Sequence, residues 1–547
     1  MFAHVALMIL AWVLILPVAL MLSIARSRYH FPAQVVFHLF NGLGVFTGFV
    51  YNHSTPDLYE HNSHHALGWV VTSFTIVWTL TSLFVAYGDS RRERASTGSH
   101  PMSAGNMAQH DTFQPYIDSP VPRYSRDSGQ GTERNSASLY GSRQNSSDFI
   151  YEHKPEGPEG EPEDDGNDQH ESHGLIGHTR VDRFISRNIS RFGTQRASKV
   201  VHITQVVIEK VLLLLGFAGL ATGFVVYGGV FRSRAIFSGL AHFVKGGIFF
   251  WYGLLTLGRW MGAFSEFGWA WNVRPQQPLV ARWKTRIPSA EFTESFVIWL
   301  YGASNVFMEH LNNWGKAWSH QDFEHVSITV LFFGGGLLGM LIESKTVRNA
   351  LNANVAMQEQ AAQEKREVAS SRFGALAAAA TTDGASAAAA HESATDDQHA
   401  ALWNKPATYT TSYNPMPALV ILLLGMMMSG HKQSSMVSTM MHAQWGMLFS
   451  GYALARAVTY IILYIQPPTS HYPARPPSEL VAAFCLTAGG LMFMMSARDT
   501  VQAIEGNGLD AMTVFTVTMG LAGAVMAWAV LVYCVKGWAV RRERVGR

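Results

Sequence analysis

Apolar residues in this chain gather in runs of about 20, the length that an α-helix needs to cross the hydrocarbon core of a bilayer. Eleven such runs occur, and each contains few charged residues. A backbone in lipid must satisfy its own hydrogen bonds, so each run is expected to form a helix. The predicted spans are 2–24, 34–52, 64–87, 202–229, 235–262, 291–311, 323–343, 416–430, 436–465, 478–497 and 511–535. The pattern therefore predicts an all-α polytopic membrane protein.

Two polar segments interrupt these runs. Residues 88–201 are rich in Ser, Gly, Asp, Glu, Arg and Pro, which cannot bury enough apolar surface to fold, so we predict disorder. Residues 344–415 combine a predicted helix, beginning VRNALNANVAMQEQ, with Ala-rich low-complexity sequence, and we expect a disordered linker. The run 416–430 is short for a span and is expected either to continue beyond Gly430 or to break there. The predicted regions are helices 1–3 at 1–87, the loop at 88–201, helices 4–7 at 202–343, the linker at 344–415, and helices 8–11 with a basic tail at 416–547.

Composition narrows the class of protein. Charged residues make up 15% of the chain, hydrophobic residues 48%, and the net charge is +2. Soluble proteins average about 25% charged residues, so we exclude a single soluble domain and a basic nucleic-acid-binding protein. The two cysteines, Cys485 and Cys534, lie in apolar runs, which leaves no disulfide framework, iron–sulfur ligation or thiolate zinc site. The expected partner is the lipid bilayer, and no nucleic acid is expected.

The distribution of basic residues predicts the orientation, because they concentrate on the cytosolic side. Those that fall on one side are Arg26, Arg28, Arg91, Arg92, Arg94, Arg282, Lys284, Arg286, Lys345, Arg348, Lys536, Arg541, Arg542 and Arg544, with Arg232, Arg234 and Arg498 as exceptions. The N-terminus is therefore expected outside or in a lumen, and the C-terminus and both polar segments in the cytosol. The expected location is the plasma membrane or the endomembranes of the secretory pathway. The apolar run begins at Phe2, so either a cleaved signal peptide is missing from the sequence or the first helix inserts unaided.

Histidines lie near the mouths of the first four helices, at His4, His38, His64, His65 and His202. Consecutive helices are antiparallel, so His4 shares the exterior side with His64 or His65, and His38 shares the cytosolic side with His202. Two neutral imidazoles from different helices can ligate one haem iron. The alternative is that these are ordinary amphipathic residues of the membrane interface. Their consistent sidedness over four helices favours two bis-histidine haem sites.

The sequence around these histidines resembles the core of the cytochrome b-561 superfamily. The matching segments are HVALMILAWVLILP from His4, QVVFHLFNGLGVFTGFVY around His38, and HHALGW, which favours His64 over His65, while His202 matches by position alone. The resemblance implies two b-type haems that carry electrons from a cytosolic reductant such as ascorbate to an exterior acceptor such as ferric iron. If the protein is an enzyme, the resemblance implies a transmembrane oxidoreductase of cytochrome b-561 type.

The whole chain resembles a fungal family of yeast transmembrane proteins, in which a haem-like N-terminal module precedes a multi-helix region. In that region, Glu and His residues gather where the topology places helix ends toward the exterior. They are Glu309, His310, His320, Glu324, His325, His431 and His442. Carboxylates and imidazoles suit zinc, iron or manganese, and the pattern resembles the transmembrane protein 45 family. The alternative is a polar network between helices that holds no metal.

Cations also lie inside the predicted helices, at Lys245, Arg259 and Arg456. A charge in the bilayer interior is costly, so it is expected to have a carboxylate partner. Glu209, in the fourth helix, is a candidate partner for Lys245, and the alternative is that Lys210 beside it takes that carboxylate.

Three functions are consistent with the sequence. The first is a dihaem electron-transfer protein of cytochrome b-561 type, with ferric reductase activity as one expected form. The second is a membrane transporter or metal-binding protein centred on the Glu and His residues of helices 6 to 9. The third is a membrane scaffold without catalysis, whose Ser- and Arg-containing cytosolic loop docks protein partners under the control of phosphorylation. We favour the first for the N-terminal module.

Overall fold

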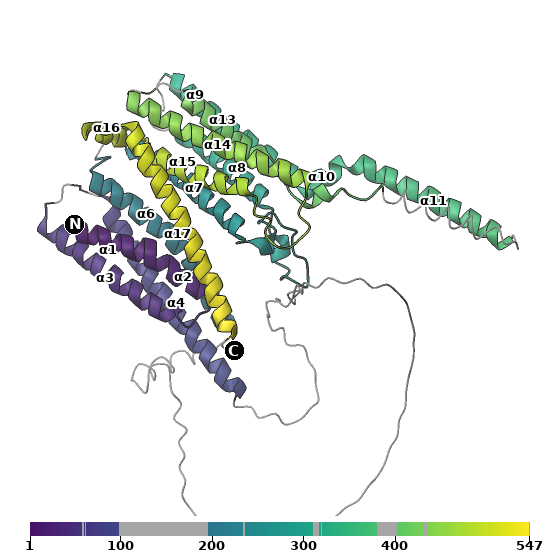
Figure 1. The fold of residues 1–547 in the computed structure, drawn as a ribbon, viewed down its shortest axis with the longest axis horizontal. Coiled ribbons are helices and arrows are strands. Elements are labelled where there is room, and N and C mark those ends of the chain that lie inside the picture. The colour runs from purple at the N-terminus through teal and green to yellow at the C-terminus, as the bar shows by residue number, and fades with distance from the viewer. Residues whose placement is uncertain are drawn as a thin grey trace, which may run out of the picture. The chain divides into compact units, whose positions relative to one another are not determined.

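The described residues are all helical or irregular, with no strand among them, which confirms the predicted all-α membrane class (Figure 1). The computed structural model describes residues 1–97, 195–309, 317–379 and 402–545, apart from 57–58, 61, 233–235, 319, 431–432 and 434. Most of the polar loop predicted to be disordered thus lies outside the described residues. The main compact unit comprises Met1–Leu83 and His202–Arg547, and a second unit comprises Phe84–Val201.

The N-terminal bundle is built from four membrane helices. Its elements are α1 (Phe2–Ile9), a π-helical stretch (Leu10–Ile15) and α2 (Leu16–Ile24), which together form one span, followed by α3 (His30–Ser54), α4 (Ser63–Thr97) and α6 (Gln195–Gly228). Phe46 and Phe49 on the outer face of α3 are 64% and 65% exposed, as expected for side chains that contact lipid. Trp12, Phe37 and Trp78 are buried between the helices and form the bundle core.

Pro17 marks the irregular turn of the first span. Proline has no N–H, so the carbonyl oxygen of Val13, four residues earlier, lacks the usual α-helical hydrogen bond. The indole Nε1 of Trp528 donates to that oxygen at 2.7 Å. Because Trp528 belongs to α17 (Ala511–Val545), this hydrogen bond fixes the last helix of the chain against the N-terminal bundle.

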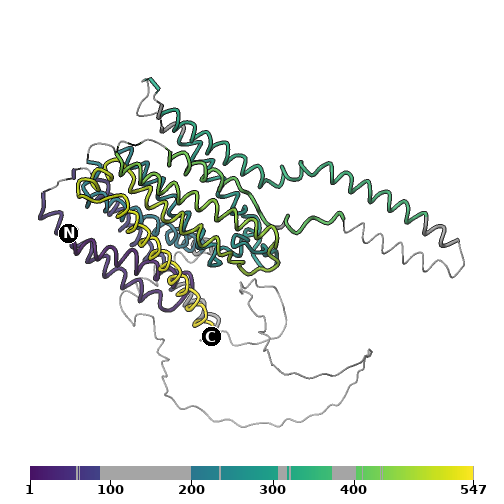
Figure 2. The backbone as a smooth tube through the Cα atoms, turned by 45° about the horizontal axis from the view of Figure 1, so that its top comes forward, coloured from purple at the N-terminus to yellow at the C-terminus, as the bar shows by residue number. Residues whose placement is uncertain are grey.

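The C-terminal part consists of helices that pack in pairs (Figure 2). Its elements are α7 (Ile236–Met261), α8 (Ala290–Glu309), α9 (His320–Glu343), α13 (Met416–Ser429), α14 (Met436–Ile465), α15 (Pro477–Met495), the short α16 (Arg498–Gly506) and α17. The pairs are α7 with α15, α8 with α9, and α13 with α14, and α14 also packs against α15.

Each predicted span contains a helix. Among the described residues, nine helices are long and apolar enough to cross a membrane. The other two are α8, which is less apolar because it carries Glu291 and Glu294, and α13, which has 14 residues. Since α13 ends at Ser429, the short run does not continue through Gly430.

Glycines let the paired helices approach backbone to backbone. A Cβ atom at Gly490 of α15 would lie 2.6 Å from the carbonyl oxygen of Gly246 of α7. A Cβ atom at Gly336 of α9 would lie 2.4 Å from the backbone nitrogen of Trp299 of α8. Membrane helices gain little hydrophobic energy by associating in lipid, so this close van der Waals packing is a main source of their attraction.

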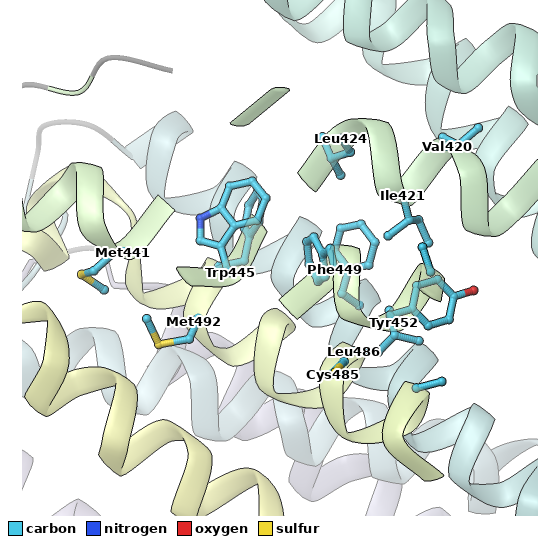
Figure 3. Packing of buried hydrophobic residues seen from close by; sticks show 14 of the residues in the cluster. Val420, Ile421, Leu424, Met441, Trp445, Phe449, Tyr452, Cys485, Leu486 and Met492 are labelled. Atoms are coloured by element: carbon cyan, nitrogen blue, oxygen red, sulfur yellow. The ribbon is translucent and has the colours of Figure 1, made fainter. Parts of the chain in front are cut away.

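Large side chains fill the space between the helix pairs (Figure 3). Trp445, Phe449 and Tyr452 follow one face of α14 at spacings of four and three residues, and all are less than 2% exposed. The ring centre of Phe449 lies 4.2 Å from that of Phe249, and the ring centre of Trp445 lies 4.6 Å from that of Phe493. These contacts join α14 to α7 and α15.

The segment 344–415 differs from the disordered linker that we expected. It begins with α10 (Lys345–Leu351) and α11 (Ala353–Ala379), which contain the predicted helix. Residues 380–401 lie outside the described residues.

The end of this segment is ordered as well. The hydroxyl of Tyr413 donates to the carbonyl oxygen of Leu463 at 2.9 Å, and the amide of Asn414 donates to that of Gly339 at 2.9 Å. The expectation of disorder was therefore wrong for this part, because its polar side chains bind carbonyl oxygens of the membrane helices.

We expect Gly336→Val to destabilise the protein by about 1–3 kcal/mol, because the new side chain collides with the backbone of α8. Thermal unfolding of the purified protein in detergent measures this loss. The matched control is Gly334→Val on the same helix, where an added Cβ atom meets nothing within 4 Å. An equal loss in both variants would contradict the close packing of α8 on α9.

Candidate functional site

His4 of α1 and His64 of α4 lie together at one end of the N-terminal bundle. Their ring centres are 6.3 Å apart and their planes make an angle of 81°. The Nδ1 of His4 donates to the carbonyl oxygen of Gly44 at 2.8 Å. The Nδ1 of His64 lies within hydrogen-bonding distance of the hydroxyl of Thr222, at 3.0 Å. Because a carbonyl oxygen can only accept, the ring of His4 is protonated on Nδ1 and keeps its lone pair on Nε2.

Two glycines make room for these rings. A Cβ atom at Gly48 would lie 2.7 Å from Nδ1 of His4, and one at Gly223 would lie 3.1 Å from Cε1 of His64. A methyl group at either position would therefore crowd the imidazole beside it. His65 is exposed and accepts a hydrogen bond from the indole one turn further along α4, so it is separate from this pair.

The loop between α3 and α4 is tied to the end of α6 near this pair. The Tyr59 hydroxyl donates to the carbonyl oxygen of Val230, and the guanidinium carbon of Arg232 lies 5.6 Å from the Tyr59 ring centre. Burial raises the pKa of the Tyr59 phenol above its ordinary value. The amide of Phe231 donates to Asp499 of α16 at 3.2 Å.

The structure does not bring His38 and His202 to the same level of the bundle. His38 is ten residues from Gly48, which lies at the level of the paired rings, so it sits about 15 Å along the bundle. His202 is 21 residues from Gly223, so it sits about 30 Å away from the same level. His38 lies at this level because α3 begins at His30, which places His38 in the third turn of the helix rather than at its start.

Both of these histidines have other partners. The Nε2 of His38 lies 2.6 Å from the hydroxyl of Thr79, and Arg26 donates to Nε2 of His202 at 3.3 Å. Among the described residues, their rings make no contact with each other. The predicted second pair is therefore not assembled in this structure.

A buried carboxylate, Glu209 of α6, organises the other half of the bundle. It accepts hydrogen bonds from Ser23, from Gln205 at 3.1 Å and from the indole of Trp78 at 3.4 Å. These bonds join α2, α4 and α6. Glu209 thus serves the N-terminal bundle, whereas Lys245, its candidate partner, lines a cavity in the C-terminal part.

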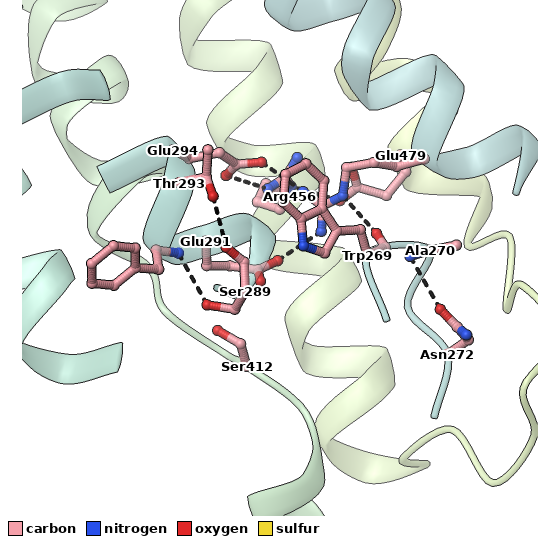
Figure 4. A network of polar contacts seen from close by, with 12 residues as sticks. Trp269, Ala270, Asn272, Ser289, Glu291, Thr293, Glu294, Ser412, Arg456 and Glu479 are labelled. Atoms are coloured by element: carbon pink, nitrogen blue, oxygen red, sulfur yellow. Dashed lines mark hydrogen bonds and ion pairs between the residues drawn. The ribbon is translucent and has the colours of Figure 1, made fainter. Parts of the chain in front are cut away.

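Two arginines and three glutamates form a buried ion network where four C-terminal helices meet (Figure 4). The members are Arg259 of α7, Glu291 and Glu294 of α8, Arg456 of α14 and Glu479 of α15. Arg259 donates to Glu291 at 2.7 Å and to Glu294 at 2.6 Å. Arg456 lies 3.2 Å from the second oxygen of Glu294 and 2.7 Å from Glu479. Glu294 therefore bridges the two arginines.

The positions of these charges follow from the helix ends. Glu291 and Glu479 lie in the first turns of α8 and α15, where the helix dipole favours negative charge, and Arg259 lies in the last turn of α7, where it favours positive charge. Sequence reasoning singled out the arginines and missed the glutamates. The available signal was an acidic residue just inside the start of an apolar run, as in AEFTESF and PSELVAAF.

Aromatic rings cover the guanidinium groups of the network. The Cζ atom of Arg259 lies 4.2 Å from the ring centre of Trp271, and that of Arg456 lies 5.4 Å from the ring centre of Tyr452. The hydroxyl of Tyr452 is hydrogen-bonded to that of Tyr252 at 2.6 Å. Such desolvated cation–π contacts contribute about 2 kcal/mol each. The aromatic rings therefore offset part of the free energy that it costs to remove the two guanidinium groups from water.

A cavity of about 300 Å³ lies beside this network, lined by residues of α7, α8, α9, α13 and α15. Glu294 lines it together with Lys245, Asn305 and His325, and most of the remaining lining is aromatic or aliphatic. A concave, mostly apolar site with a few polar groups is the usual form of a small-molecule site. The C-terminal part thus contains a candidate binding site.

The predicted cluster of Glu and His ligands can be placed only in part. The side chains that lie outside the described residues are those of Glu309, His310, His320 and His431. Glu324 lies in the first turns of α9, His325 lines the cavity, and the ring centre of His442 lies 6.4 Å from that of His242. Among the described residues, no group of three or more His, Cys, Asp or Glu side chains is arranged to hold a metal ion. The metal site stays a prediction.

Comparisons with known proteins cover nearly the whole chain. The family model described as "Protein YTP1-like, C-terminal" matches residues 215–537, and "Domain of unknown function (DUF2427)" matches residues 1–87. The "Uncharacterized membrane protein C3B8.06" of Schizosaccharomyces pombe is 33% identical over 99% of this chain and 94% of its own length. The "Uncharacterized membrane protein YCR061W" of Saccharomyces cerevisiae is 32% identical over 61% of this chain and 48% of its own. "Protein YTP1" of Saccharomyces cerevisiae is 20% identical over 44% of this chain and 38% of its own. No solved structure matches this chain.

We expect Glu294→Ala to lower the free energy of unfolding by about 3–5 kcal/mol, because it leaves two buried arginines short of a partner. Thermal unfolding in detergent measures the change. The control is Glu505→Ala on the exposed surface of α16, which should change stability by less than about 0.5 kcal/mol. A Glu294→Ala protein as stable as the control would show that the network does not hold the helices.

Proposed function

This chain belongs to the YTP1-like family of membrane proteins, and we propose a function for its N-terminal bundle. The N-terminal bundle binds a b-type haem between His4 and His64 and serves in membrane electron transfer of cytochrome b-561 type. The observation that carries this proposal is the adjacent, nearly perpendicular pair of imidazoles, each with its Nδ1 at hydrogen-bonding distance from a neighbouring helix.

The spacing of the two rings would let His4 and His64 together hold one metal-centred group. Two imidazoles that each bind one metal ion at about 2 Å have ring centres about 6 Å apart, and the separation here is 6.3 Å. Histidine ligands commonly donate their second nitrogen to a backbone carbonyl or another acceptor, which fixes the tautomer and the ring. The hydrogen bonds of His4 to Gly44 and of His64 to Thr222 have this form.

The residues of the chain would hold and orient the group, and haem held in this way supplies reversible one-electron transfer. Gly48 and Gly223 keep the space around the two rings open. The Tyr59 loop, bonded to the end of α6, restrains the segment that leads into His64. With the predicted orientation, this end of the bundle faces the exterior, where an acceptor such as ferric iron would be reduced.

A chain of aromatic rings supports electron passage through the bundle from a cytosolic reductant such as ascorbate. The ring centres of Trp12 and Phe37 are 5.4 Å apart, and those of Phe37 and Trp78 are 6.0 Å apart. The proposal assigns one haem rather than two, because His38 and His202 lie at different levels of the bundle. Activity as an oxidoreductase is part of the proposal.

We expect a reduced-minus-oxidised absorbance spectrum of the purified full-length protein to show b-type haem at about one haem per chain. His4→Ala and His64→Ala should each abolish the signal, because either change removes an axial ligand. His202→Ala is the control and should retain it. Absence of haem from protein made in haem-replete cells would overturn the proposal, and two haems per chain, with one lost in His202→Ala, would restore the second site.

We expect Gly48→Ala to reduce haem content several-fold, because the added methyl group occupies space 2.7 Å from Nδ1 of His4. The matched control on the same helix is Gly42→Ala, where the added Cβ atom meets nothing within 4 Å and the helix gains about 1 kcal/mol of propensity. Haem content and spectrum should be unchanged in the control. Equal haem content in the two variants would show that the ring of His4 is not a ligand.

A further inference from the structure

Two loops close one end of the C-terminal part. The first, residues 262–289, joins α7 to α8, and the second, residues 466–476, joins α14 to α15. The backbone amide of Val273 donates to the carbonyl oxygen of Ser470 at 2.9 Å, and the imidazole of His471 donates to the carbonyl oxygen of Val273 at 2.9 Å. These bonds join the two loops into one structure, which we call the loop cap.

The loop cap carries an excess of positive charge. Its basic residues are Arg274, Arg282, Lys284, Arg286 and Arg475, and its acidic residue is Glu266. Lys284 is paired with Glu266. Five positive charges thus stand against one negative charge, so the surface of the loop cap attracts anions.

Arg274 holds part of the first loop in a fixed shape. Its guanidinium donates to the carbonyl oxygens of Lys284 and Ile287, both at 2.6 Å. The 3₁₀ turn Lys284–Arg286 lies within this stretch. The segment is therefore ordered by bonds within the loop itself, and Arg274 is occupied by them.

The same stretch presents two arginines and two apolar side chains at the surface. Arg282 and Arg286 are exposed, and among the described residues neither side chain makes an ion pair or a hydrogen bond. They are four residues apart, so their Cα atoms lie at most about 14 Å from each other. Trp283 is 59% exposed and Leu279 is 53% exposed. Charged and apolar groups thus lie side by side on an ordered surface.

The loop cap lies at the boundary of the membrane. It joins α14 directly to α15, and both helices are long and apolar enough to cross a bilayer. Tryptophan is enriched at this level of membrane proteins, where hydrocarbon gives way to head groups. The distribution of basic residues predicts that this end faces the cytosol, and the cytosolic leaflet is the one that carries anionic lipids.

The loop cap also contacts the buried ion network. The Nε of Arg259 donates to the carbonyl oxygen of Trp269 at 2.7 Å, and the indole of Trp269 donates to the carbonyl oxygen of Pro288 at 2.9 Å. A ligand that binds the folded loop cap and not the unfolded chain therefore stabilises this part of the protein against unfolding.

We propose that Arg282 and Arg286 bind the phosphate of an anionic phospholipid, with Trp283 and Leu279 against its glycerol backbone and upper acyl chain. Guanidinium groups match phosphate oxygens in geometry as well as in charge. The exposed apolar side chains beside the arginines favour a lipid over free phosphate, and the excess positive charge favours an anionic lipid over a zwitterionic one. The site is separate from the histidine pair, so the proposal does not depend on haem.

The test follows thermal unfolding of full-length, delipidated protein in a neutral maltoside detergent. Phosphatidylserine, phosphatidylcholine with the same acyl chains, and inorganic phosphate are titrated separately. We expect phosphatidylserine alone to raise the unfolding temperature, in a saturable way. Each arginine near an anionic head group increases affinity about fivefold, so the double variant Arg282→Gln/Arg286→Gln should need about tenfold or more phosphatidylserine for half of the shift.

The matched control is Arg498→Gln. Arg498 is an exposed arginine without an ion pair among the described residues, and it begins α16 after the far end of α15, away from the loop cap. This variant should respond to phosphatidylserine as the parent does, and all variants should unfold at the parent's temperature without lipid. An equal shift with phosphatidylcholine, a shift with inorganic phosphate alone, or an unchanged response of the double variant would each overturn the proposal.

Discussion

The carboxylate of Glu294 binds Arg259 and Arg456 at once, and the C-terminal part depends on this interaction more than on any other. With Glu291 and Glu479 it places α7, α8, α14 and α15 at a fixed depth relative to one another. A buried charge that loses its partner costs several kcal/mol, so none of these helices can slide by a turn without that penalty. This fixed register of the helices therefore sets the shape of the cavity beside Glu294.

Glycine sets the second constraint, which is how near the helices approach. In the C-terminal part, Gly246 and Gly490 bring α7 and α15 into backbone contact, and Gly336 does the same for α9 and α8. In the N-terminal bundle, Gly48 and Gly223 instead leave space that histidine rings occupy. Glycine thus allows close backbone contact at one interface and leaves space for a side chain at another, depending on which atoms the neighbouring helix places opposite it.

The two parts of the protein contain different functional groups. The N-terminal bundle offers two imidazoles with available nitrogens and a core of aromatic rings, which suit a redox group. The C-terminal part offers a mostly apolar cavity beside a network of fixed charges. The hydrogen bond from Trp528 to the carbonyl oxygen of Val13 connects α17 with the first span.

The sequence by itself determined the membrane class, the positions of the spans and the placement of His4 on the same side as His64 and His65. All three follow from local runs of apolar residues and from the rule that consecutive helices are antiparallel. Tertiary structure alone decided the rest. The level of His38 depended on where α3 begins, and the partner of Glu209 depended on which helices pack together. The ion network and the cavity join residues up to about 250 positions apart in the chain. Their contacts are set by glycine packing and desolvation, which leave no local pattern in the sequence.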